Sequence, residues 1–266
     1  MLNIKFLDQS NQKKAFLCIS ILLLGVVLIP LFLIAHYGFM CADDFSFTLP
    51  SIESWRADHL IIKVLKKQFV FAYGHYFNWQ GTFSMEWLGS TLMVLIGENH
   101  YYLGAYLALG GMVISEMVLF VYIGVRLLEA DIYDTGIISC WLIALQILMV
   151  PYPVEAFYWN CSSILYTVGF SMSVLLVLLL VLFLKQSSLI KGSDSKSRVK
   201  MIALQVGILI LSLLIAFGNY ISSIFCFSSL ALLVIAVWIK KVRGKIAITL
   251  DAIVYAVFCP RNNGSW

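Results

Sequence analysis

Two adjacent carboxylates, Asp43 and Asp44, are the side chains in this sequence best placed for proton chemistry. They follow the first long apolar segment (15–37) by only a few residues. Adjacent acids at a membrane boundary repel each other and are costly to desolvate, so one of them is a candidate proton acceptor, and the two together permit a divalent cation. The alternative is that both are solvated loop acids that cap a following helix.

A second candidate is the mixed aromatic and polar stretch 73–83, which contains His75 and Trp79. Aromatic side chains that combine an apolar face with a polar edge suit sugar rings. They equally suit the bilayer interface, where belts of Trp and Tyr are common. The composition of this stretch by itself favours the interfacial belt.

A third candidate is Glu155, which is the only charge in a wide apolar stretch and lies four residues before Trp159. An isolated acid at membrane depth indicates a functional site. The alternative is a loop acid in water between two apolar segments. Glu116, inside another apolar segment, is interpreted as a polar tie between helices.

The composition determines which elements must position these residues. Of 266 residues, 61% are hydrophobic and 12% are charged, whereas soluble domains have about 45–50% and about 25%. The mean hydropathy is +0.93. We therefore predict an all-α, multi-pass transmembrane helical bundle that forms a single transmembrane domain over 1–266.

Apolar segments long enough to cross a bilayer predict about seven spans, since each span needs roughly 20 residues. A shorter segment at 85–97 is predicted to be a re-entrant or interfacial helix. The expected spans are 15–37, 101–125, 137–151, 164–184, 201–218, 220–239 and 246–259.

Basic residues occur in short blocks between the apolar segments, which is a topology signal and not a nucleic-acid-binding pattern. They predict a cytoplasmic N-terminus and a cytoplasmic basic loop at 185–200. Segment 38–100 is then an extracytoplasmic loop, and the apolar positions 61, 62, 65 and 69 predict an amphipathic helix within it. The sequence contains neither a CxxC pair nor an HExxH motif, so it predicts no metal site of those kinds.

Three motifs together resemble a bacterial family of multi-pass membrane proteins that is grouped with the GT-C glycosyltransferases. They are Asp43-Asp44-Phe45, the block Asn78-Trp79-Gln80-Gly81-Thr82, and Glu155-Ala156-Phe157-Tyr158-Trp159 followed by Tyr166. The resemblance covers roughly residues 15–180. It departs at Thr82, where many relatives carry Arg.

The resemblance implies a GT-C-like enzyme of the bacterial cytoplasmic (inner) membrane. It would transfer a sugar from a polyprenyl-phosphate carrier to a cell-envelope glycan acceptor on the outer face. Asp43 or Asp44 would be the catalytic base, and Arg56 with neighbouring lysines would neutralise the carrier phosphate. The resemblance also assigns substrate contacts to Glu155 and Trp159, and His75 and Trp79 complete the candidate substrate-binding set.

Two alternatives stay open at this stage. GT-C proteins usually have more helices, and this chain ends just after an apolar segment, so we expect it to be the N-terminal part of a longer protein, with an inactive membrane remnant as one interpretation. The other is a transporter or flippase for lipid-linked sugars that uses Glu116 and Glu155.

Overall fold

The computed structural model describes residues 9–79, 81–189 and 195–239. Every regular element in this part of the chain is a helix, and no strand occurs in it. The predicted all-α class is therefore confirmed. The elements are α1 (Gln9–Ala35), α2 (Asp43–Asp58), α3 (Ile61–Asn78), α4 (Ser84–Ile96), η1 (Glu98–His100), α5 (Tyr102–Arg126), α6 (Ile132–Leu148), η2 (Val154–Tyr158), α7 (Asn160–Ser163), η3 (Ile164–Val168), α8 (Gly169–Leu189), α9 (Ser195–Ala216) and α10 (Tyr220–Ile239).

Four helical stretches are long and apolar enough to cross a membrane: Ser10–Ala35, Tyr102–Arg126, Asn160–Ser187 and Val199–Ala216. Three shorter apolar helices accompany them, at Ser84–Ile96, Ile132–Leu148 and Tyr220–Ile235. The expected span at 246–259 lies outside the described residues. The structure thus supports a membrane helical protein with four candidate spans among the described residues, fewer than the seven that the sequence predicts.

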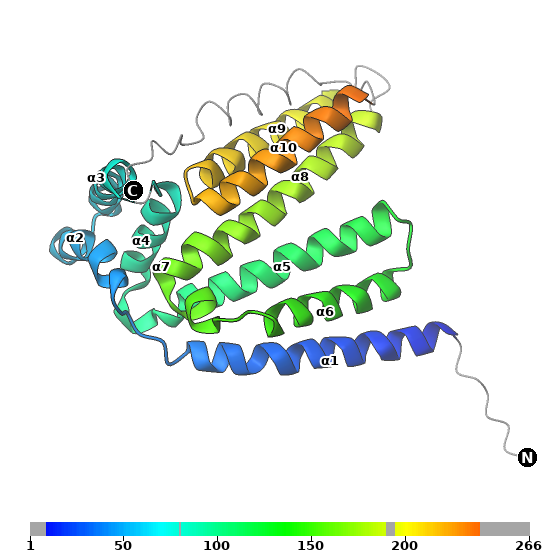
Figure 1. Cartoon of the computed structure of the whole chain (residues 1–266), viewed down its shortest axis with the longest axis horizontal. Coiled ribbons are helices and arrows are strands. Elements are labelled where there is room, and N and C mark those ends of the chain that lie inside the picture. The colour runs from blue at the N-terminus through cyan, green and yellow to red at the C-terminus, as the bar shows by residue number, and fades with distance from the viewer. Residues whose placement is uncertain (1–8, 80, 190–194, 240–266) are drawn as a thin grey trace, which may run out of the picture.

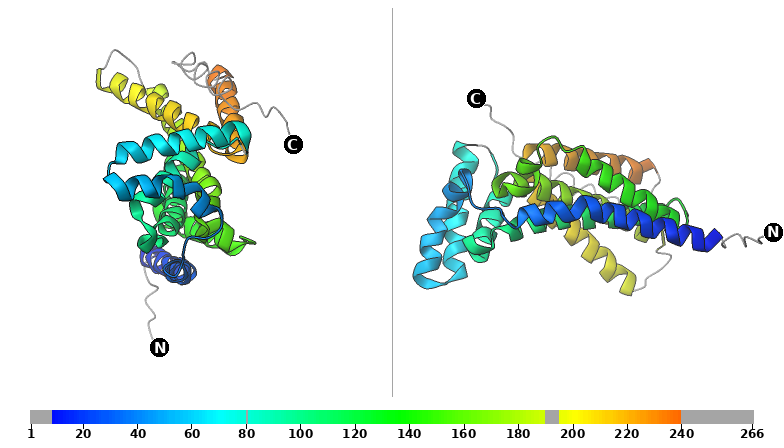
Figure 2. Two further views of the ribbon diagram at one scale, coloured as in Figure 1. Left: turned by 90° about the vertical axis from the view of Figure 1, so that its left-hand side faces the viewer. Right: turned by 90° about the horizontal axis from the view of Figure 1, so that it is seen from below.

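The long helices lie side by side, and α2 and α3 lie across one end of them (Figures 1 and 2). Helix α1 packs on α6, α5 lies between α6 and α8, and α8 packs on α9 and α10. Helix α4 contacts both α2 and α3 at the crossed end. If the long helices cross a bilayer, α2 and α3 lie along its surface.

Helix α1 shows why water is not the solvent of the long helices. Its outer side chains are strongly exposed, with Leu22 at 68% and Leu33 at 61%. Leaving a row of such side chains in water costs about 25 cal/mol per Å² of apolar surface. Hydrocarbon removes that cost, so the bilayer accounts for this surface.

Polar groups fix the opposite end of the bundle, where α1 meets the start of α6. The Asp131 carboxylate caps α6 by accepting hydrogen bonds from the backbone N–H groups of Tyr133 and Asp134. Lys13 Nζ lies 2.5 Å from the Asp134 carboxylate. Such caps satisfy the free N–H groups of a first helical turn.

Segment 38–100 is more ordered than the predicted loop with one amphipathic helix. It contains α2, α3, α4 and η1. The predicted amphipathic positions lie on α3, and 85–97 corresponds to α4. Most of the basic segment 185–200 also lies in helices, because α8 extends to Leu189 and α9 begins at Ser195. Which side of a membrane each segment occupies stays a prediction.

Candidate functional site

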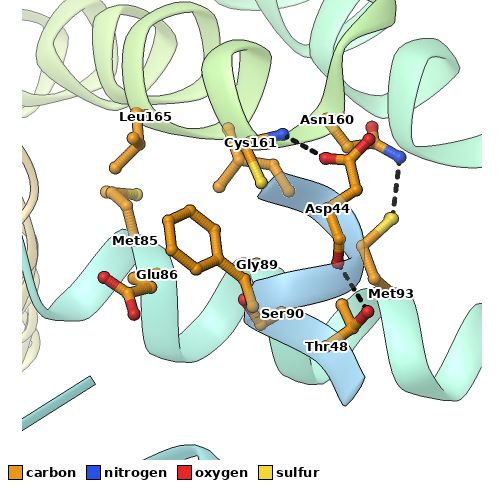
Figure 3. A pocket seen from close by; sticks show the side chains of 12 residues that line it. Asp44, Thr48, Met85, Glu86, Gly89, Ser90, Met93, Asn160, Cys161 and Leu165 are labelled. Carbon is orange, nitrogen blue, oxygen red and sulfur yellow. Dashed lines mark hydrogen bonds between the residues drawn. The ribbon is translucent and has the colours of Figure 1, made fainter. Parts of the chain in front are cut away.

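The two adjacent acids occupy very different environments at the start of α2. Asp43 is exposed, whereas Asp44 is only 1% exposed. Both lie in the first turn of the helix, where the macrodipole favours negative charge. Figure 3 shows the Asp44 side chain directed toward the segment that begins at Asn160. The pair is therefore not a symmetric dyad: one carboxylate is free and the other is buried.

Asp44 is surrounded by hydrogen-bond donors from distant parts of the chain. The Tyr101 hydroxyl donates to Oδ2 at 2.5 Å, and the Cys41 backbone N–H donates to the same oxygen at 3.3 Å. The backbone N–H of Cys161 donates to Oδ1 at 2.9 Å. Both oxygens thus have partners. Since Cys161 lies in the first turn of the helix that starts at Asn160, Asp44 caps that helix.

Tyr101 links Asp44 to Asn160. The Asn160 backbone N–H donates to the Tyr101 hydroxyl at 3.1 Å, and this hydroxyl in turn donates to Asp44. Burial raises the pKa of the Tyr101 phenol, so it keeps its proton. Asn160 is itself 1% exposed, and its side-chain amide donates to the sulfur of Met93 at 2.8 Å. The network joins α2, α4, the start of α5 and α7.

The segment that brings Cys161 to Asp44 is irregular. The π-helical turns η2 and η3 flank the short helix α7. Trp159 between η2 and α7 has extended backbone angles, φ −80 and ψ 106, so a new helix begins at Asn160. The Thr167 hydroxyl donates to the Ala156 carbonyl and ties the two turns together. π-helical turns often occur at functional sites, and here they flank the Cys161 backbone N–H that donates to the Asp44 carboxylate.

A small cavity of about 20 Å³ lies beside Asp44 (Figure 3). A cavity of this size has room for about one water molecule. Its polar lining comes from α2, α4 and α7: Asp44, Thr48, Glu86, Ser90, Asn160 and Cys161. The sequence reasoning did not select Glu86, Tyr101 or Asn160. The sequence does contain a sign of Glu86, because an acid in an otherwise apolar segment indicates a functional residue. No such sign marks Tyr101.

Glu86 lies next to His75, one of the predicted substrate-binding residues. Its Oε1 is 2.9 Å from His75 Nδ1, and its side chain is 3% exposed compared with 30% for His75. The Thr82 hydroxyl donates to the other carboxyl oxygen at 3.3 Å. Thr82 therefore holds the Glu86 side chain in the first turn of α4.

Ala42, the residue before α2, has a strained backbone. Its φ of 46 and ψ of −120 lie in a region that favours glycine. We expect Ala42→Gly to raise the free energy of unfolding in detergent by about 1 kcal/mol. The matched control, Ala57→Gly in the exposed face of α2, should lower it by about 1 kcal/mol. Thermal unfolding of both variants checks the opposite signs; destabilisation by both would show that position 42 is not strained.

Arg56 lies away from the Asp44 cavity, in an open cleft of about 340 Å³ between α2 and the α4–η1 turn. Its guanidinium is 2.9 Å from the Glu98 carboxylate, and both side chains are exposed. Trp55, Asn99 and His100 also line this cleft. Met93 lines both the cleft and the Asp44 cavity, so one side chain separates the two.

The structure does not bring the remaining predicted residues into the cavity. Trp79 is 72% exposed just after α3, and Glu155 is exposed in η2. Trp159 is half-buried beside Asn160, and its indole N–H has no hydrogen-bond partner among the described residues. Of the seven predicted side chains, Asp44 lines the cavity and His75 contacts a residue that lines it.

Lysines gather in a groove of about 590 Å³ between α2 and α3. Lys63 pairs with Asp58 at 2.5 Å. Lys66 and Lys67 line the same groove with the acid Glu53, Ser54, Val70 and Phe71. Cationic ammonium groups over an apolar floor suit an anionic group that is attached to a hydrocarbon chain.

No group of three or more His, Cys, Asp or Glu side chains in the described residues has a metal-binding arrangement. Comparisons with protein-family models, curated proteins and solved structures found no match to this chain.

Proposed function

We propose that this chain is a GT-C-like membrane glycosyltransferase that moves a sugar from a polyprenyl-phosphate carrier to an envelope acceptor on the outer face of the bacterial inner membrane. The observation that carries the proposal is the exposed carboxylate of Asp43 beside the buried Asp44, at the bundle end that α2 and α3 cross. In this proposal α6 and α10 cross the membrane in addition to the four candidate spans, α4 is the re-entrant or interfacial helix that the sequence predicts, and the N-terminus is cytoplasmic.

Asp43 is the better candidate for the base, because both oxygens of Asp44 already accept hydrogen bonds. In the proposed reaction an acceptor hydroxyl oxygen attacks the anomeric carbon of the sugar, and Asp43 takes the hydroxyl proton. The bond between that carbon and the phosphate oxygen breaks, and its electron pair leaves with the polyprenyl phosphate. Asp44 is a positioning residue that fixes the turn carrying Asp43.

The groove with Lys66 and Lys67 supports a phosphate-bearing substrate. A lipid-linked donor keeps its phosphate at the membrane surface, which is where helices that cross the bundle end would lie. The cleft that contains Arg56 and Trp55 offers a cation and an aromatic ring together, a combination that suits a sugar next to a phosphate.

Sugar transfer in proteoliposomes supplied with a polyprenyl-phosphate sugar tests the proposal. Asp43→Asn should reduce transfer at least about 100-fold, since a general base typically contributes 10²–10⁴-fold. Its folding should be unchanged because the side chain is exposed. Glu129→Gln, at an exposed acid near the opposite end of the bundle, should keep full activity. Full activity of Asp43→Asn would rule out this base.

One observation favours a transporter or flippase instead. Glu116 is 1% exposed inside α5, and Gln146 of α6 is the polar side chain that approaches its carboxyl group. Buried acids in spans often serve proton or substrate paths. Movement of a labelled lipid-linked sugar across the bilayer without covalent transfer, and its loss in Glu116→Gln, would replace the enzyme proposal by this one.

A further inference from the structure

The contact between His75 and Glu86 joins two buried polar atoms that have no other partner. His75 Nδ1 and Glu86 Oε1 are 2.9 Å apart. Neither atom has another hydrogen-bond partner among the described residues. A buried donor or acceptor without a partner destabilises the fold. One proton shared between the two atoms satisfies both.

The surroundings decide which residue holds that proton. Burial lowers the pKa of His75 and raises the pKa of Glu86 to about 7; α4 is not one of the four candidate spans. Both shifts favour the uncharged forms, so a proton shared across the 2.9 Å contact would be donated by the Glu86 carboxylic acid to the neutral imidazole. His75 must then carry its own proton on Nε2.

Few other charged groups face Glu86. The cavity brings Asp44 from α2 and the thiol of Cys161 from α7 toward it, and α3 contributes His75. Helix α9 reaches the start of α4 through backbone carbonyls, of which the Phe217 carbonyl accepts from Ser84 N–H. The turn η3 contributes apolar side chains to the cavity, and η1 lies beyond the far end of α4. Asp44 is therefore the charge that a deprotonated Glu86 would meet.

We propose that Glu86 and His75 form a proton-sharing pair that keeps Glu86 uncharged in the cavity that it lines with Asp44. The uncharged pair holds α4 in its position against α2. The structural part of this inference stands alone, and its catalytic part rests on the proposed function. Loss of the shared proton puts two carboxylates around a cavity with room for about one water molecule. Their repulsion weakens the packing of α4 on α2, and Asp43 shifts with α2.

Nitrogen NMR of histidine-labelled protein in detergent tests the pair without any substrate. We expect His75 to be a neutral Nε2–H tautomer at pH 6 and its signal to move with a midpoint near pH 7 as Glu86 loses its proton. In Glu86→Gln this step should vanish, while the signals of His36, His59 and His100 stay as in the wild type. Charging of the wild-type His75 ring with an ordinary midpoint of about 6.5 would overturn the pair.

A pH profile of sugar transfer tests the positioning role. The rate of sugar transfer by the wild type should fall above about pH 7. The decline should approach tenfold per pH unit, because one required proton is lost. Glu86→Gln keeps an uncharged side chain of the same size, so it should stay active with a flat profile, whereas Glu129→Gln should retain the wild-type profile. A decline that persists in Glu86→Gln would overturn the role. No transfer by the wild type at any pH would overturn the proposed function, and the NMR result would still decide whether the pair exists.

Discussion

Asp44→Ala should lower the free energy of unfolding by more than about 3 kcal/mol. The substitution removes the carboxylate to which three hydrogen-bond donors are directed. The backbone N–H groups of Cys41 and Cys161 would lose their partner, and the Tyr101 hydroxyl would keep only its 3.3 Å contact with the Tyr158 carbonyl. Each buried group left without a partner costs about 1–3 kcal/mol. The first turns of two helices would also lose a negative charge. Thermal unfolding in detergent should show a fall in midpoint of more than about 6 °C.

Asp43→Ala is the matched control for this loss. It removes the same chemical group from the same helical turn, but its side chain is exposed, so the change should stay within about 0.5 kcal/mol. Tyr101→Phe gives a second check. As a single substitution, Tyr101→Phe removes the 2.5 Å hydrogen bond to Asp44 and should lower the free energy of unfolding. In the Asp44→Ala background the same substitution should lower it much less, because the Asp44 carboxylate is already absent. Equal losses for Asp43→Ala and Asp44→Ala, or additive losses with Tyr101→Phe, would contradict the capping role.

This asymmetry matters for the assignment of the base. Loss of sugar transfer in an Asp44 variant does not by itself identify a base, because the variant is expected to disturb the fold around α7. Loss in an Asp43 variant with an unchanged unfolding midpoint does identify one. The two carboxylates thus separate a chemical role from a positioning role within one helical turn.

The long helices could be predicted because hydropathy alone determines them. The expected segments 15–37 and 101–125 correspond to α1 and α5 within a few residues at most ends. Within segment 38–100 the sequence predicts helices that correspond to α3 and α4, but not α2. Helix α2 carries polar and apolar residues without a clear stripe, and its stability comes from contacts with α3 and α4. Local pattern therefore predicts two of the three helices, and the third forms through tertiary packing.

In the site, too, some residues could be predicted from the sequence and others depend on tertiary contacts. The pair Asp43 and Asp44 stood out from residue type. The alternative that both are solvated acids that cap the following helix is wrong for Asp44, which is buried and caps a helix that begins 116 residues later at Asn160. Nothing in the sequence relates Asp44 to the backbone of Cys161, since a backbone donor has no residue signature. Tyr101 likewise looks like an ordinary residue at the start of a span.

Glu86→Gln should change how stability depends on pH. The folded-state pKa of Glu86 is raised to about 7 from an ordinary value of 4.5 by burial. Its stabilising contribution is therefore fully present below about pH 4.5 and is lost as the pH rises through about 7. The free energy of unfolding of the wild type should fall by up to about 3 kcal/mol across this window because of this one group. The variant cannot lose a proton and should lack that part of the fall.

Unfolding midpoints measured at pH 5 and pH 8 in the same detergent test this difference. The wild type and Glu86→Gln should have similar midpoints at pH 5, where both side chains are uncharged, and the variant should be the more stable at pH 8. Glu98→Gln provides the control, because Glu98 is exposed and pairs with Arg56 at the surface, where such pairs contribute about 0–1 kcal/mol. It should follow the wild type at both pH values. If Glu86→Gln instead lost stability at pH 8 more than at pH 5, Glu86 would be a carboxylate that the fold requires in its charged form, and the neutral pair with His75 would be wrong.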